Sequence, residues 1–225
     1  MTTPREQRKH EKRNRILKAA MRVFSTRSYS GASMDAIAIE AAVSKPTLYQ
    51  YFGDKQGLFA AVLAEAREHL LSPFAGSQGR DMVEVLMEFS WHYADFVLQP
   101  EILSLARLVI GEVERFPDLG QQYLAQGPDK ALSGITGYLE QMKQAGRLEF
   151  DDGQLCAGDL WSLIFSAPRE RALHIPNLCL SKHELSRSIF NGLRVFLKAY
   201  STQAAADLTL LEQLRQNVQL QKLKP

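Results

Sequence analysis

The sequence predicts an all-α fold, and three observations lead to this prediction. Apolar residues recur at spacings of three and four along almost the whole chain, and no alternating strand pattern of useful length interrupts them. Gly, Pro and Ser mark most of the breaks between the periodic segments. The chain has 225 residues, of which 45% are apolar and 23% are charged, so one large domain or two small ones are expected.

Four helices are expected at the start of the chain. The first carries apolar residues on one face over residues 16–24. Ser33 can cap a second helix that ends near residue 41, and Ser44 can cap a third over residues 45–52. Asp54 can cap the fourth.

Longer amphipathic helices are expected in the rest of the chain. Their apolar stripes cover residues 82–96, 102–113, 119–146, 152–168, 181–200 and 207–220. Gly127-Pro128 lies inside the third of these segments, which therefore forms either one helix or two. Ser181 and Glu184 fit a capping box, and Gly146 sits where a C-terminal cap belongs. We expect Pro168 to end its helix and residues 166–180 to form a loop.

The net charge of +2 is unevenly distributed. Residues 1–55 contain eleven Lys or Arg and five Asp or Glu, whereas residues 56–225 contain sixteen and twenty. The basic segment 1–55, followed by a mildly acidic remainder, indicates that residues 1–55 bind an anionic partner. The alternative is a basic segment that is only solvated.

Several classes of protein are not expected. The longest stretch without a charged residue has eleven residues, too few to span a membrane, and the basic start MTTPREQRKHEKRNR has no apolar core typical of a secretory signal. Two cysteines suit a reducing cytoplasm. No His follows a Glu by three residues, and no HExxH, GxSxG or GxxxxGK motif occurs, so we expect no metal site, no cofactor and no enzyme.

Residues 33–52 have the size of a helix-turn-helix, and the second helix of this pair has an unusual composition. Leu48 and Phe52 are spaced to be buried together, and the other side chains of SKPTLYQYF include no acid. Hydroxyls, an amide, aromatic rings and one cation suit phosphates and base edges better than they suit a solvated helix face. A short core helix is the alternative.

Residues 16–63, ILKAAMRVFSTRSYSGASMDAIAIEAAVSKPTLYQYFGDKQGLFAAVL, resemble the N-terminal domain of the TetR family of bacterial transcriptional repressors. The resemblance implies a basic arm at 1–11, a three-helix DNA-binding domain at 12–58 and a larger helical ligand-binding and dimerisation domain at 59–225. A weaker resemblance of residues 107–112, followed by Phe116-Pro117, points to efflux-pump repressors of that family.

The family resemblance also implies which residues bind DNA. The third helix would enter the major groove, and the candidate contacts are Ser33, Lys45, Pro46, Thr47, Tyr49, Gln50, Tyr51 and Lys55. A solvated lysine is the alternative for Lys55. Arg13 and Arg15 touch backbone phosphates or the minor groove, or they remain free in solvent. The family usually has Gly in the turn where this chain has Ala42, and a left-handed backbone there would cost Ala about 1 kcal/mol.

A hydrophobic small-molecule effector is expected in the body of the protein. The candidate lining residues are Phe89, Trp91, Tyr93, Phe96, Arg107, Tyr123 and Trp161. We expect them to surround a cavity formed by helices 82–96, 102–113 and 119–145, with Arg107 as a polar anchor. For each aromatic residue, ordinary core packing is the alternative.

The resulting hypothesis is a repressor that binds a palindromic double-stranded DNA operator as a homodimer and is released by its effector. The family pairs two late helices across the dimer, here about 152–165 and 181–200, and we expect Phe190 at the exposed edge of that face. An activator or a ligand-blind regulator of the same fold is the first alternative. An all-α lipid carrier or enzyme is the second.

Overall fold

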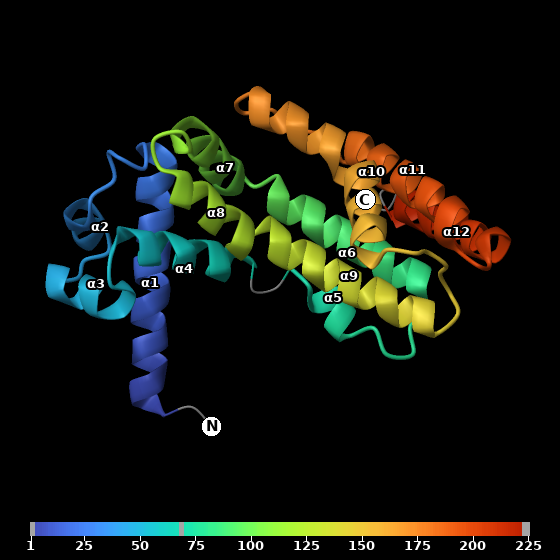
Figure 1. The fold of residues 1–225 in the computed structure, drawn as a ribbon, viewed down its shortest axis with the longest axis horizontal. Helices are drawn as coiled ribbons and strands as arrows, with labels where there is room; N and C mark the ends of the chain where they lie inside the picture. Colours follow the sequence, from blue (N-terminus) through green and yellow to red (C-terminus); the bar gives the residue numbers. More distant parts are fainter. Residues whose placement is uncertain (1–2, 68–69, 222–225) are drawn as a thin grey trace. The chain divides into compact units, whose positions relative to one another are not determined.

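The computed structural model describes residues 3–67 and 70–221, and the helices within them confirm the all-α prediction (Figure 1). Within these ranges no strand forms, and an isolated bridge joins Leu148 to Ser201. None of the helices found there is both long enough and apolar enough to cross a bilayer.

The first of two compact units contains residues 3–67 together with residues 100–129. Its helices are α1 (Pro4–Thr26), α2 (Met34–Glu40), α3 (Lys45–Phe52), α4 (Lys55–Arg67), α7 (Pro100–Glu112) and α8 (Pro117–Gln126). Phe24 of α1 and Phe59 of α4 meet edge to face at 5.2 Å in its core, which Leu105 of α7 joins. Ser104 of α7 also donates a hydrogen bond to the carbonyl of Ser25 at 2.9 Å.

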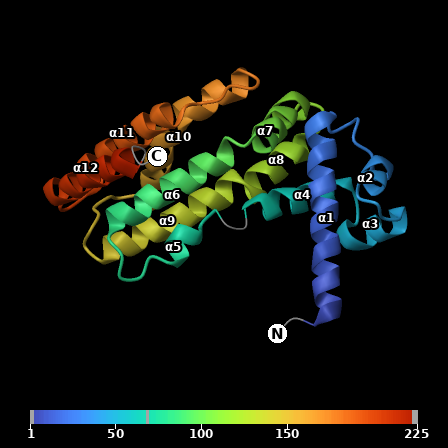
Figure 2. The same cartoon turned by 180° about the vertical axis from the view of Figure 1, so that it is seen from behind.

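The second compact unit contains residues 70–99 and 130–221. Its helices are α5 (Ser72–Ala75), α6 (Met82–Val97), α9 (Pro128–Gln144), α10 (Gly153–His174), α11 (Lys182–Tyr200) and α12 (Ala204–Gln221). Apolar side chains of α6, α9, α10 and α11 form one continuous core. Helices α10 and α11 lie side by side in Figure 1 and, from behind, in Figure 2.

The predicted helix caps are confirmed. The Oγ atoms of Ser33 and Ser44 accept from backbone N–H groups of their own helices, and Ser181 and Glu184 form the expected capping box. Gly146, at φ +72°, follows the end of α9, and the segment 119–146 divides at Gly127 into two helices. These ends follow from local chemistry, because cap residues satisfy backbone groups that a helix leaves unpaired.

The prediction that Pro168 ends its helix is wrong. Helix α10 continues through Pro168 to His174, so most of the expected loop at 166–180 is helical. Proline has no N–H for the carbonyl of Ile164, four residues earlier. Ser188 of α11 supplies the missing donor, because its Oγ donates to that carbonyl at 2.8 Å.

Most of the predicted basic arm is helical. Residues 4–11 form the first turns of α1, whose capping box joins Thr3 and Glu6. The expected domain at 12–58 stays a functional prediction. In the described structure its helices share a compact unit with α7 and α8.

Candidate nucleic-acid interface

Helices α2 and α3 form the predicted helix-turn-helix, and their turn contains one unusual residue. The N–H of Val43 donates to the carbonyl of Ala38 at 3.0 Å, which closes the turn directly after α2. Ala42 has φ +49°, so the left-handed backbone expected from the family pattern is present without the glycine that favours it.

One face of α3 is buried and another is available to a partner. Leu48 is completely buried, which confirms its predicted packing role. Lys45, Pro46, Tyr49 and Gln50 are exposed. The available face of α3 is therefore polar and aromatic, as the sequence indicated.

Thr47 and Tyr51, two further candidates on α3, are only half-exposed. The hydroxyls of Thr47 and Ser44 lie 2.8 Å apart, so this contact belongs to the start of the helix. The ring of Tyr51 packs against that of Phe52 at 5.9 Å and borders the core of the first unit. Ser33 is exposed, and its hydroxyl caps α2.

Lys45 has an acidic partner that the composition of α3 did not reveal. Its Nζ lies 2.8 Å from Oδ1 of Asp35, which projects from the first turn of α2. The hydrogen bond to Asp35, reinforced by its negative charge, raises the pKa of Lys45. Both side chains are more than half exposed, so a phosphate can compete for the lysine.

Lys55 has a structural role in the described protein. Its Nζ donates to the carbonyls of Tyr29 at 2.8 Å and Ala32 at 3.2 Å, and it lies 4.4 Å from the centre of the Tyr29 ring. Partial burial lowers the pKa of Lys55. These contacts hold the loop between α1 and α2, and they favour neither the predicted phosphate contact nor a freely solvated lysine.

A basic groove of about 820 Å³ runs between the start of α1 and α3. Its lining residues are Arg5, Glu6, Arg8, Lys9, His10, Lys12, Arg13, Thr47, Gln50 and Tyr51. Arg13 also pairs with Glu65 of α4 at 2.6 Å, which joins α1 to the rest of the unit. The cationic side chains of α1 thus line the same groove as side chains of α3. This arrangement suits a nucleic acid, which presents both charged phosphates and base edges.

The expected ligand-lining residues divide between the two units. Phe89, Trp91, Tyr93 and Phe96 of α6 and Trp161 of α10 belong to the second unit, whereas Arg107 and Tyr123 belong to the first. The cavity expected among these helices therefore stays a prediction.

Tyr93 is the centre of an aromatic cluster in the second unit. Its ring lies 4.5 Å from Phe165, 5.7 Å from Phe89 and 6.5 Å from Trp161, measured between centroids. Phe74 stacks between Phe89 and Tyr138, at 4.5 and 4.6 Å. Phe74, Tyr138 and Phe165 were not among the sequence-predicted residues, although Tyr138 shares the helical spacing of Ile135 and Leu139.

Two family models match the chain. Residues 16–62 match the model of bacterial regulatory proteins of the tetR family, and residues 84–202 match the C-terminal domain of AefR-like transcriptional repressors. The first match contains the helix-turn-helix, and the second contains the aromatic cluster around Tyr93. Both models describe transcriptional regulators and not enzymes.

Curated relatives match shorter parts of the chain. The activator FasR of Mycolicibacterium smegmatis is 48% identical over 62 residues, which are 28% of each chain. The regulator UidR of Escherichia coli K12 is 33% identical over 44% of this chain and 45% of its own. The repressor NicS of Pseudomonas putida is 30% identical over 46% of this chain and 50% of its own. The chain thus spans half or less of these relatives' length.

Solved structures match most of the chain. A TetR-family regulator from Mesorhizobium loti has 27% identity and a TM-score of 0.76, over 86% of this chain and 98% of its own. The flavonoid-responsive regulator FrrA has 30% identity and a TM-score of 0.68, over 86% of this chain and 99% of its own. The helix-turn-helix, the two family models and these structures agree, and the chain belongs to the TetR family of bacterial transcriptional regulators.

Proposed function

We propose that this protein regulates transcription by binding a palindromic DNA operator as a homodimer, with a hydrophobic small molecule as its effector. The observation that carries the proposal is the exposed, acid-free face of α3 beside the basic start of α1. Phosphate contacts from α1 would set the position of the protein on DNA, and side chains of α3 would read base edges in the major groove. A regulator of this kind acts where the chromosome is, in the cytoplasm.

Within α3, Tyr49 and Gln50 are the best candidates for base contacts. Both are exposed, and 42% of the surface of Tyr49 is accessible. Lys45 and Thr47, near the helix N-terminus, are better placed for phosphate, where backbone N–H groups also favour an anion. Lys55 is not proposed as a DNA contact, because its Nζ already donates to the carbonyl of Tyr29.

The dimer surface is supported by apolar side chains that the single chain leaves uncovered. Leu155 and Leu163 of α10 are 69% and 37% exposed, and Val195 of α11 is 36% exposed. Leu163 and Leu155 are two turns apart, so they lie on one face of α10 with small residues such as Ser162. The expectation for Phe190 is wrong, because Phe190 is 6% exposed and packs inside its own chain.

The effector proposal is supported by the aromatic cluster around Tyr93 and by the named response of one relative. FrrA is described as flavonoid-responsive, and flat aromatic compounds suit a site lined by rings. Repression is proposed on the match to a repressor family model. Activation is the second candidate, because FasR, a named activator, is 48% identical to this chain over 62 residues.

The proposal is tested by selecting DNA from a random-sequence pool with the wild-type protein. We expect an enriched palindrome whose half-sites are centred about one helical turn apart, roughly 34–36 Å. Adding a hydroxylated flavone should then lower affinity for the selected DNA. A reporter gene behind the selected sequence separates repression from activation. No enriched sequence, or a single half-site, would contradict the proposal.

A further inference from the structure

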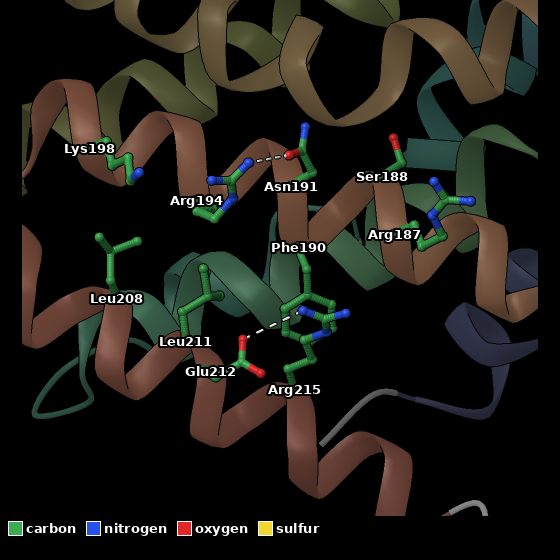
Figure 3. Close-up of a pocket in the computed structure, with 10 residues that line it drawn as sticks. All are labelled: Arg187, Ser188, Phe190, Asn191, Arg194, Lys198, Leu208, Leu211, Glu212 and Arg215. Carbon is green, nitrogen blue, oxygen red and sulfur yellow. Dashed lines mark hydrogen bonds and ion pairs between the residues drawn. The ribbon is translucent and has the colours of Figure 1, made fainter.

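A groove of about 600 Å³ lies between α11 and α12 (Figure 3). Its lining residues are Arg187, Ser188, Phe190, Asn191, Arg194, Lys198, Leu208, Leu211, Glu212 and Arg215. Helix α12 begins at Ala204, after residue 202, where the match to the C-terminal family model ends. One wall of the groove is therefore built by a segment outside the matched region.

The groove has an excess of positive charge. Arg187, Arg194 and Lys198 follow one another along α11 and are exposed (Figure 3). Arg194 donates to the amide oxygen of Asn191 at 2.7 Å. Among the side chains that the structure describes, none of these three cations pairs with a carboxylate. Arg215 of α12 does, at 3.5 Å from Glu212, so the lining as a whole carries four cations and one acid.

The floor of the groove is apolar. Phe190 and Leu211 are 6% and 4% exposed, and Leu208 packs partly buried beside them. The hydroxyl of Ser188 is committed to the carbonyl of Ile164, so it adds little polarity to the floor. An apolar floor below a cationic rim matches a molecule with a hydrocarbon body and an anionic head, and the volume suits a small ligand.

We propose that this groove binds an amphipathic organic anion. Its carboxylate or phosphate would be held by Arg194 and Lys198, and its hydrocarbon part would cover Phe190, Leu208 and Leu211. Arginine donates two parallel hydrogen bonds to either kind of head group, and lysine adds a point charge. The site is distinct from the aromatic cluster around Tyr93, and it goes beyond the proposed effector of that cluster.

The test measures binding to the full chain without DNA by isothermal titration calorimetry. The probes are decanoate and decyl phosphate, used below their micelle concentrations. The contributions of the ligand's head group and hydrocarbon tail are separated with three further compounds, decanol, decyltrimethylammonium and inorganic phosphate. We expect one site per chain for both anionic probes, at least tenfold weaker binding of decanol, and no binding of decyltrimethylammonium or free phosphate. The ratio between decanoate and decyl phosphate shows which head group the site prefers.

The matched variants are the double substitution Arg194→Gln with Lys198→Gln and the single substitution Lys130→Gln. Lys130 is an exposed cation of α9 in the same unit and does not line the groove. The double variant should bind both anions at least tenfold more weakly, whereas Lys130→Gln should bind them as the wild type does. Circular dichroism checks that the variants fold.

Three outcomes would overturn the proposal. The first is that the wild type binds neither anion. The second is that the double variant binds both anions as tightly as the wild type, which would place them at another site, and the third is that the double variant loses dimerisation, which would make the groove a subunit contact. Sedimentation of the double variant detects the last case. Since no DNA is present, failure of operator binding would leave this result unaffected.

Discussion

At the residue scale, the turn of the helix-turn-helix contains a strained alanine. Ala42 has φ +49°, a conformation that disfavours side chains with a Cβ atom. We expect Ala42→Gly to raise the free energy of unfolding by about 0.5–1 kcal/mol, because relief of strain exceeds the added entropy of the unfolded chain. Urea denaturation measures the change.

The neighbouring Ala41 provides the control for this prediction. It is buried and has an ordinary φ of −81°, so Ala41→Gly should lower the free energy of unfolding by about 1 kcal/mol. Equal destabilisation by both substitutions would show that the backbone at Ala42 is unstrained.

Asp35 is expected to restrain DNA binding through its pair with Lys45. A phosphate has to displace this carboxylate, and the carboxylate itself repels DNA. Asp35→Asn should therefore raise affinity for the selected operator severalfold and steepen its salt dependence by about one phosphate contact. Titrations at several salt concentrations measure both quantities, with Glu114→Gln, an exposed acid beyond α7, as the control. If Asp35→Asn bound the operator more weakly than the wild type, Asp35 would stabilise the protein–DNA complex and would not restrain its formation.

At the element scale, the continuation of α10 through Pro168 depends on a hydroxyl from another helix. Ser188→Ala would remove the side-chain donor to the partly buried carbonyl of Ile164 and should lower the free energy of unfolding by about 1–2 kcal/mol. In a Pro168→Ala background, the backbone N–H of residue 168 supplies a donor to the Ile164 carbonyl. Ser188→Ala should therefore lower the free energy of unfolding markedly less in that background. Chemical denaturation of the four proteins in this double-mutant cycle gives the coupling. Equal costs in both backgrounds would contradict the assignment.

The capping box of α11 predicts a dependence of stability on pH. The backbone N–H of Ser181, its hydroxyl and Arg171 lower the pKa of Glu184 in the folded protein. This contribution to stability is present above the ordinary carboxyl pKa of about 4.5 and is lost as pH falls through the folded value.

Glu184→Gln keeps a capping side chain without the charge. The wild type should therefore be more stable than Glu184→Gln at pH 7, and the difference should shrink as pH falls below about 4.5. Thermal unfolding measured between pH 3 and pH 7 follows this difference. A constant difference across the range would exclude the carboxylate as its source.

The elements show where sequence reasoning succeeds and where it fails. Caps are local, so Ser33, Ser44 and Ser181 could be assigned from the sequence. The continuation past Pro168 depends on Ser188, twenty residues away in sequence, and no local pattern reveals it. The apolar pattern does not predict the first turns of α1, because residues 4–15 have almost no apolar stripe. The spacing of Thr3 and Glu6, which fits a capping box, is the local signal for this helix start.

At the scale of the whole molecule, the fold class and the family follow from the sequence, but the site depends on tertiary contacts. The polar face of α3 could be predicted, whereas the pairing of Lys45 with Asp35 and of Lys55 with loop carbonyls could not. Helical spacing predicts which side chains share a face of a helix but does not reveal that Arg107 and Trp161 belong to different compact units.

Dimerisation belongs to this scale as well. We expect Leu155→Glu and Leu163→Glu to give monomers in sedimentation experiments, because each places a charge in the proposed apolar interface. Ile110→Glu is the control, since Ile110 is 64% exposed on α7, outside that surface. The monomeric variants should bind the selected operator at least 100-fold more weakly, because each contacts one half-site. A wild type that sediments as a monomer at micromolar concentration would end this part of the account.

The most direct test of the central claim is the operator affinity of Tyr49→Ala, measured by fluorescence anisotropy on the selected DNA. Leu124→Ala is the matched control, because Leu124 is 49% exposed and Tyr49 is 42% exposed, and Leu124 lies on α8. If α3 reads DNA, Tyr49→Ala weakens binding at least tenfold with unchanged helix content and dimerisation, while Leu124→Ala binds as the wild type does. Unchanged affinity of Tyr49→Ala, or equal losses in both variants, would contradict the assignment of α3 as the recognition helix.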